Sequence, residues 1–88
     1  MNNVFLDILP SIDLHGYPED MIEILISDFI LENIRLKKYK IVIIHGKGFG
    51  ILKNKTHELL RKDKRVSNYR LDAFNTGCTV VELNKDLC

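Results

Sequence analysis

Residues 39–45 form the segment that most restricts the folds open to this chain. Their sequence, Y-K-I-V-I-I-H, is almost wholly apolar and rich in β-branched side chains. This composition is typical of a strand that is covered on both faces, as in the sheets of α/β proteins. The segment therefore predicts an inner strand, and the sequence around it should supply the helices that cover the sheet.

Two amphipathic helices are predicted, one before and one after this strand. The first begins at Pro18, which is followed by the carboxylates of Glu19 and Asp20, and extends to about Leu36. Apolar residues at helical spacing form the stripe that should face the sheet: Ile22, Leu25, Ile26, Phe29 and Leu36. The second helix extends from Ile51 to about Lys62, with Leu52, Thr56, Leu59 and Leu60 inward and Lys53, Lys55, Arg61 and Lys62 outward.

Three further strands are predicted at residues 11–15, 66–72 and 79–83, which gives the order β-α-β-α-β-β. Strand–helix–strand crossovers are right-handed, so the first three strands should be parallel and the last antiparallel beside the third. We predict an α/β fold, a two-layer sandwich in which a four-stranded mixed sheet carries two helices on one face. One domain would span residues 11–84, between an apolar extension at 1–10 and a tail at 85–88.

The apolar extension contains Val4, Phe5, Leu6, Ile8 and Leu9. It either crosses the sheet face that the helices leave open or meets a partner, and the sequence is compatible with both. No apolar run approaches the roughly 18 residues of a membrane span, and the start lacks the pattern of a secretory signal. We therefore expect a cytoplasmic protein with no membrane partner.

Charge is distributed unevenly along the chain, although the net charge is only +1. Residues 1–34 carry seven acidic side chains and no Lys or Arg, whereas residues 35–65 carry eleven basic and two acidic ones. The basic segment is compatible with phosphate binding, but such a run is usually only a solvated surface. The two cysteines, Cys78 and Cys88, offer neither a disulfide framework nor a paired metal motif, so reduced thiols are expected.

Both strands that precede a helix end in the dipeptide His-Gly, at His15 and His45. The carboxyl ends of parallel strands meet at one edge of a sheet, which is where ligands bind in such folds. Asp13 and Lys47 should lie at the same edge, so a carboxylate, two imidazoles and an amine would line one cleft. Imidazoles exchange protons near neutral pH and a lysine stabilises a phosphate, so this group of residues suits phosphodiester chemistry.

Structural explanations exist for each of these residues. A histidine that ends a strand is more often a turn residue than a catalyst, and the Asp13 carboxylate is suited to cap a backbone turn. His57, within the second helix, is predicted to be a surface residue. Phe49 either stacks on a nucleic-acid base or packs against its own helix. The glycine turn matches neither the Walker A nor the dinucleotide-binding pattern, which excludes those nucleotide sites.

Three segments together resemble the Smr (small MutS-related) domain family: I-D-L-H-G at 12–16, V-I-I-H-G-K-G-F-G-I-L at 42–52 and T-V-V-E-L at 79–83. The match runs from about residue 11 to residue 84 and implies a stand-alone, single-domain member. Its expected fold is similar to that of the carboxy-terminal domain of translation initiation factor three. One departure is the turn at 75–78, which keeps a single glycine, Gly77, where the family usually has several.

The resemblance implies a nucleic-acid-binding endonuclease that acts on RNA or on branched or structured DNA, with the ribosome as a further partner. Asp13 and His15 of the DLHG motif would carry the cleavage chemistry, and His45, Lys47 and Gly48 of the HGKG motif would form the substrate- or phosphate-binding part. From the residues themselves, His45 is also a candidate for proton transfer, and Gly46, Gly50, Lys53 and Lys55 are further candidates for phosphate binding. The sequence leaves open the oligomeric state and whether a divalent metal such as magnesium or manganese takes part.

Two functions other than an endonuclease are compatible with the sequence. A non-catalytic adaptor would use the same edge to grip nucleic acid or the ribosome without cutting it. A protein-interaction module would use Ile24 and Leu31, which fall on the outer side of the first helix, together with the apolar extension.

Overall fold

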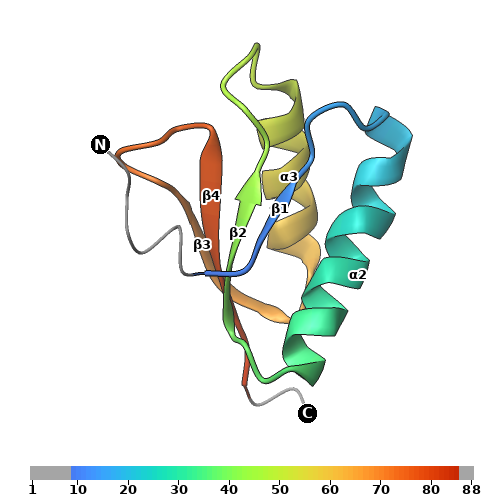
Figure 1. Cartoon of the computed structure of the whole chain (residues 1–88), viewed down its shortest axis with the longest axis vertical. Coiled ribbons are helices and arrows are strands. Elements are labelled where there is room, and N and C mark those ends of the chain that lie inside the picture. The colour runs from blue at the N-terminus through green and yellow to red at the C-terminus, as the bar shows by residue number, and fades with distance from the viewer. Residues whose placement is uncertain (1–8, 86–88) are drawn as a thin grey trace.

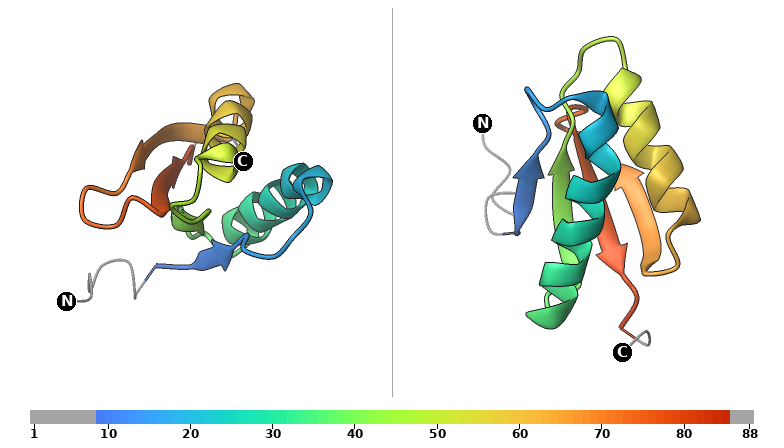
Figure 2. Two further views of the ribbon diagram at one scale, coloured as in Figure 1. Left: turned by 90° about the horizontal axis from the view of Figure 1, so that it is seen from above. Right: turned by 90° about the vertical axis from the view of Figure 1, so that its right-hand side faces the viewer.

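The computed structural model of this chain describes residues 9–85, which form one four-stranded mixed sheet with two α-helices on one face (Figures 1 and 2). This confirms the predicted architecture. The elements in chain order are β1 (Ser11–Asp13), the 3-10 turn η1 (Glu19–Met21), α2 (Ile22–Arg35), β2 (Lys40–Ile44), α3 (Ile51–Lys62), β3 (Val66–Leu71) and β4 (Cys78–Leu83).

The strands lie in the order β1-β2-β4-β3. β1 and β2 are parallel, with Asp13 beside Ile44, and β4 is antiparallel to both β2 and β3. The first three strands therefore share one direction, as predicted, and the last strand lies between the second and the third. As a result, β1, β2 and β3 all have their carboxyl ends at the same edge of the sheet, which we call the carboxyl edge.

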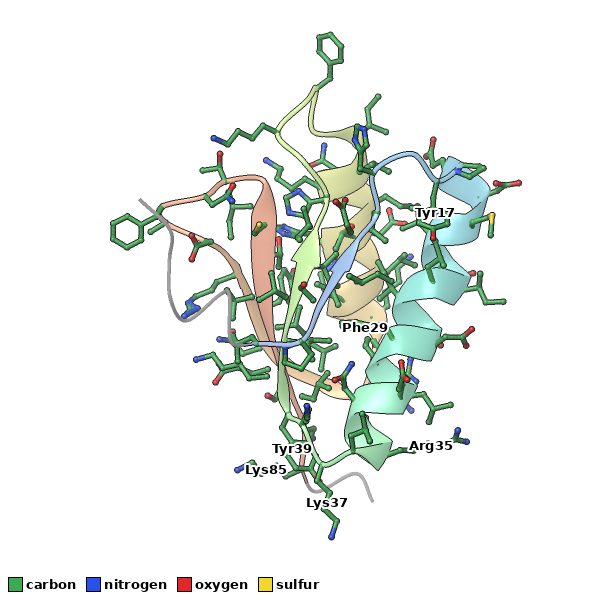
Figure 3. The ribbon with its side chains drawn as sticks, in the orientation of Figure 1. Tyr17, Phe29, Arg35, Lys37, Tyr39 and Lys85 are labelled. Carbon is green, nitrogen blue, oxygen red and sulfur yellow. The ribbon has the colours of Figure 1, made fainter. Side chains whose placement is uncertain are left out.

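The core lies between the sheet and the two helices. It is formed by Leu14, Ile22, Ile26, Ile30, Ile41, Ile43, Leu60, Val81 and Leu83, all of which are almost completely buried. Tyr69 of β3 packs against this group. So does Phe29 of α2, which Figure 3 shows between the helix and the sheet. Each buried aliphatic side chain contributes roughly 1.5–3 kcal/mol, so this layer is the main source of stability. None of the helices within residues 9–85 has the length and apolar composition needed to span a bilayer.

The end of α2 differs from the prediction. Leu36 was expected in the buried stripe, but it is exposed because the helix ends at Arg35 and Leu36 is its C-cap. Ile30, which the predicted stripe left out, is completely buried instead. After the cap, Lys37 takes a left-handed conformation with φ of 58°, and its N–H donates to the Ile34 carbonyl at 3.0 Å. Lys37 thus occupies a position where helices usually have glycine.

A polar contact joins α2 to the start of β3. The Arg65 guanidinium donates to both carboxylate oxygens of Asp63, at 3.0 and 2.7 Å, and to the Ser27 hydroxyl of α2 at 3.1 Å. This ion pair lowers the pKa of Asp63. The contact fixes the turn between α3 and β3 against the neighbouring helix.

The second face of the sheet carries Val42 and Val80, which are also buried. Within the described residues, no helix covers this face. The predicted crossing of this face by Val4, Phe5, Leu6 and Ile8 lies outside the described residues and stays a prediction.

Candidate functional site

The two His-Gly segments leave the sheet side by side at the carboxyl edge. Because β1 and β2 are parallel and adjacent, the Leu14 N–H donates to the Ile44 carbonyl at 2.9 Å, one residue before each histidine. We call residues 13–16 the DLHG turn and residues 45–48 the HGKG loop. The structure therefore brings together two motifs that lie thirty residues apart in the sequence.

The DLHG turn holds Asp13 and His15 at the surface. One carboxylate oxygen of Asp13, Oδ1, accepts a hydrogen bond from the His15 backbone N–H at 2.9 Å. Asp13 thus caps the turn, which is the structural role considered for it, and the cap ends β1 two residues earlier than predicted. Both side chains are nevertheless exposed, so the carboxylate and the His15 imidazole remain accessible to a ligand.

The HGKG loop lies at the surface, and two of its four residues are glycines, which have no side chain to cover the backbone. Gly46 and Gly50 have φ of 83° and 81°, a conformation that other residues adopt only with strain. Gly48 is different, because its φ is not in that region and a Cβ there would meet nothing within 4 Å. Neither backbone conformation nor packing explains glycine at position 48, whereas close approach of a ligand would.

His45 is enclosed at the base of this loop, with 5% of its surface exposed. Its Nδ1 bonds to the Gly46 carbonyl at 2.9 Å, and its Nε2 bonds to the Thr79 hydroxyl of β4 at 2.8 Å. A carbonyl only accepts, so Nδ1 carries the proton and, in the neutral ring, Nε2 accepts from Thr79. Both nitrogens of His45 are therefore used within the protein.

His57 of α3 bonds to the same hydroxyl group. Its Nε2 lies 2.7 Å from Thr79 Oγ1, and because that hydroxyl donates its proton to His45, it accepts one from His57. The His57 ring meets His45 edge-on at 6.0 Å between centroids and lies 5.1 Å from the ring of Tyr69. We call this hydrogen-bonded series, His57 to Thr79 to His45, the imidazole chain.

The position of His57 corrects the prediction that it is a surface residue. It is half-buried against β4, because it precedes the buried Leu60 by three residues and so lies on the flank of the inward face of α3. That spacing is the sequence signal that identifies it. Thr79 had no signal of its own beyond membership in an apolar strand.

Burial is the main cause that lowers the pKa of both His45 and His57, because it disfavours the charged ring. The hydrogen bond to Gly46 opposes this effect at His45. The positive charge of Lys53 lowers the pKa of both rings further, and at His57 the charge of His45 contributes more than Lys53 does. Neutral imidazole rings at His45 and His57 are consistent with the proton positions deduced from the hydrogen bonds.

The β3–β4 loop is tied to the HGKG loop through Gly77. The Gly77 carbonyl accepts from the N–H groups of His45 and Gly46, both at 2.9 Å. A Cβ at Gly77 would lie 3.2 Å from Asn75 Oδ1 and 3.4 Å from the Gly46 backbone, which is close contact. Gly77, the single glycine of this turn, therefore lies where a side chain would be in close contact with the neighbouring backbone.

The predicted phosphate-binding lysines lie around this edge. Lys47 is exposed in the HGKG loop, and Lys53 and Lys55 are half-exposed on the first turns of α3. The charge of Lys53 is the smallest of the causes that lower the pKa of the two imidazoles. At Cys78 the charges of Asp72 and Asp13 raise the pKa of the thiol and the charge of Lys47 lowers it.

Neither a metal centre nor a reactive thiol is formed by the described residues. Between residues 9 and 85, no three His, Cys, Asp or Glu side chains are grouped so that they could hold a metal ion. The described residues therefore do not form a three-ligand protein site for a divalent cation. Burial raises the pKa of the Cys78 thiol, and the nearby carboxylates of Asp72 and Asp13 raise it further, which keeps the sulfur protonated.

Two surface depressions lie away from these motifs. One, of about 470 Å³, lies between α2 and the α3–β3 turn, where Arg65 lines it. Another, of about 590 Å³, is lined by Tyr39 and Lys40 at the opposite end of β2. Neither of the two includes the DLHG turn or the HGKG loop.

Known proteins resemble this chain in sequence and in fold. The chain is 39% identical over 77 residues to the endonuclease MutS2 of Clostridium acetobutylicum and 36% identical over 76 residues to that of Gemmatimonas aurantiaca. These matches cover 83% of this chain but only 10% and 9% of those proteins. The chain thus spans about a tenth of their length.

Two solved structures share the architecture. The Smr domain of Thermus thermophilus MutS2 superposes with a TM-score of 0.82 at 29% identity, covering 86% of this chain and 99% of that one. YdaL, a stand-alone small MutS-related protein from Escherichia coli, superposes with a TM-score of 0.80, covering 97% and 78%, and at 22% identity it shows the fold alone. The model of the Smr domain matches residues 12–84, and this chain therefore belongs to the Smr domain family.

Proposed function

We propose that this domain binds nucleic acid across the carboxyl edge of its sheet and cuts it as an endonuclease. The observation that carries the proposal is the hydrogen bond between Leu14 and Ile44, which fixes the DLHG turn beside the HGKG loop. A carboxylate and an exposed imidazole then adjoin a glycine-rich, lysine-bearing loop. The name of the MutS2 relatives, endonuclease, supports the same activity.

Phosphate binding is assigned to the HGKG loop and the start of α3. Lys47 supplies a positive charge, and the open space at Gly48 lets a phosphate approach the backbone. Lys53 and Lys55 extend the positive surface along α3, and Gly46 and Gly50 allow the loop conformation. These groups bind any nucleic-acid backbone, because phosphate contacts carry no sequence information.

Proton transfer is assigned to His15, with Asp13 beside it. On RNA, an imidazole would take the proton of a 2′-hydroxyl, whose oxygen then attacks the adjacent phosphorus. The bond from phosphorus to the 5′-oxygen breaks and that oxygen takes up a proton, leaving a cyclic phosphate and a 5′-hydroxyl. His45 was a candidate for the same role, but both its nitrogens are hydrogen-bonded, so we assign it to holding the HGKG loop in place.

A cleavage assay on labelled single-stranded RNA and on branched DNA tests this proposal. Asp13→Asn and His15→Gln should each lower the cleavage rate by about a hundredfold or more, since general acid–base groups contribute that much. Thermal melting of both variants serves as the control for folding. Cleavage that persists in both variants would contradict the assignment, and a parallel series with a chelator shows whether a dissolved metal ion takes part.

Binding without cleavage is the second candidate function, and one observation favours it. Oδ1 of Asp13 already accepts a hydrogen bond from the His15 N–H, so it caps its own turn. An adaptor for nucleic acid or for the ribosome would use the same loop and lysines. Wild-type protein that binds strands in a salt-sensitive manner but never cuts them would establish this function in place of the first.

A further inference from the structure

Three aromatic side chains of the described residues are exposed, and all three lie on loops at the carboxyl edge. Of the six Phe and Tyr residues between residues 9 and 85, Tyr17, Phe49 and Phe74 are exposed, with 47%, 99% and 88% of their surface accessible. The other three, Phe29, Tyr39 and Tyr69, pack against the core.

Each of the exposed rings lies on a different loop at the carboxyl edge. Tyr17 follows β1, Phe49 follows β2 and Phe74 follows β3. Figure 1 shows these three loops along one edge of the molecule, and Figure 3 places Tyr17 at the start of the helical layer. The DLHG turn and the HGKG loop belong to two of the same loops.

Hydrogen bonds fix the loops that carry these rings. The Tyr17 N–H donates to the Leu14 carbonyl at 3.2 Å. Asp72 accepts from the N–H groups of Phe74 and Asn75, at 3.1 and 2.7 Å, and so shapes the β3–β4 turn. Exposure of Phe74 is therefore a property of a formed turn. Phe49, expected either to stack on a base or to pack on its own helix, does not pack there.

Holding apolar rings in water is unfavourable, at roughly 25 cal/mol for each Å². A partner that covers them must also accept the charged groups on or beside the same loops, namely Asp13, Lys47 and Asp72, so it is not a continuous apolar surface. Unpaired nucleic-acid bases offer flat faces for the rings and phosphates for the lysine. A duplex does not fit, because its base faces are already stacked.

We propose that Tyr17, Phe49 and Phe74 are stacking platforms for the bases of a single-stranded nucleic acid that crosses the carboxyl edge. Lys47 contacts a phosphate between two stacked bases. The platforms read the faces of the bases and not the sugar, so RNA and DNA strands bind through them alike. This inference rests on the proposed nucleic-acid binding and adds to it the strandedness of the ligand, while cleavage is not required.

The test measures affinity by fluorescence anisotropy, using labelled oligouridylate, oligothymidylate and a blunt duplex, each about twelve nucleotides long, at one salt concentration. Phe49→Ala and Phe74→Ala should each weaken binding to both single strands by about fivefold to a hundredfold, and leave duplex binding unchanged. Phe49→Tyr keeps a ring and should keep the affinity, whereas Phe49→Leu keeps only bulk and should lose it. Ile24→Ala on α2, an exposed apolar position outside the three loops at the carboxyl edge, is the control.

A strand with 2-aminopurine at one position gives a second, direct measurement. Its fluorescence should be quenched on binding wild-type protein, and this quenching should disappear with Phe49→Ala or Phe74→Ala. All of these side chains are exposed, so the variants should fold, and thermal melting checks that they do.

Three results would overturn the inference. If alanine variants bind single strands as wild type does, or if Phe49→Leu keeps full affinity, the rings are not stacking platforms. Wild-type protein that binds neither strand nor duplex would instead refute the proposed function itself. A decrease in affinity that is equal for duplex and single strand would show a loop defect and would also reject the platforms.

Discussion

Thr79 is the residue on which the imidazole chain depends, because its hydroxyl is the common partner of His45 and His57. Replacement by valine keeps the shape but leaves a buried imidazole nitrogen without a partner. The free energy of unfolding should fall by roughly 1–3 kcal/mol. Urea denaturation measures this change. Thr79→Ser, which keeps the hydroxyl, should recover most of this stability, and a Val variant as stable as wild type would show that the chain contributes little.

The same two histidines make stability depend on pH. Their pKa values are lowered in the folded protein, so near and below pH 6.5 the unfolded chain binds more protons than the folded one. Their contribution is present above the unfolded pKa and is lost as the pH falls below it. Unfolding free energy should therefore decrease from about pH 7 to about pH 5.

Urea denaturation at several pH values checks this dependence, with His57→Gln as the comparison. The Gln side chain has an amide N–H that can donate to Thr79 but does not titrate, so the decrease should be smaller in this variant. If the unfolding free energy of His57→Gln changes with pH as steeply as that of wild type, groups other than His57 cause the pH dependence.

At the scale of single residues, the sequence predicts the position of the site better than its contacts. Asp13, His15, His45 and Lys47 were placed at one edge because the ends of parallel strands meet there, and the structure has them there. His57 was missed, since a hydrogen bond to a residue 22 positions away depends on how β4 inserts into the sheet. The sequence pattern around His57 does not indicate which strands β4 pairs with.

At the scale of secondary-structure elements, the backbone at the end of α2 is strained at Lys37, and a substitution there should relieve the strain. Lys37 is left-handed at the position where a helix usually ends with glycine, and the N–H of Lys38 donates to the Asn33 carbonyl at 2.8 Å. A side chain in this conformation costs about 1–2 kcal/mol, which the flexibility of glycine in the unfolded chain partly offsets. Lys37→Gly should therefore raise the unfolding free energy by about 0.5–1 kcal/mol.

Thermal or urea melting of Lys37→Gly measures this increase, and Figure 3 shows the residue at the end of the helix, opposite the carboxyl edge. Lys38→Gly is the matched control, because its backbone is not left-handed and glycine there should lower stability. A Lys37→Gly variant less stable than wild type would show that the lysine side chain itself stabilises the cap.

The sequence predicted which helices and strands form and in what order, but it predicted their first and last residues less accurately. β4 begins one residue before its predicted start, because Cys78 pairs with Ile44. The place of β4 between β2 and β3 was not predicted, although its nearly continuous burial is what an inner strand requires. The start of the first helix is a 3-10 turn, which the carboxylates after Pro18 do not distinguish from an α-helical turn.

At the scale of the whole molecule, the two helices differ in charge, since α2 carries three acidic side chains and one basic one, whereas α3 carries four basic side chains and one acidic one. Both helices lie on one face of the sheet, so a nucleic acid that leaves the carboxyl edge should follow α3 and avoid α2. Replacing Lys53 and Lys55 by Glu should lower affinity for every sequence tested.

The salt dependence of binding distinguishes this path from a general effect of charge. For every phosphate of a single strand that the variant no longer binds, the slope of log affinity against log salt should become shallower by roughly 0.7. Arg35→Glu with Lys38→Glu makes the same change in net charge at the opposite end of the molecule, where Figure 3 shows Arg35, and should leave the slope unchanged. If both double variants lower affinity equally and neither changes the slope, net charge alone attracts the nucleic acid, and the strand does not follow α3.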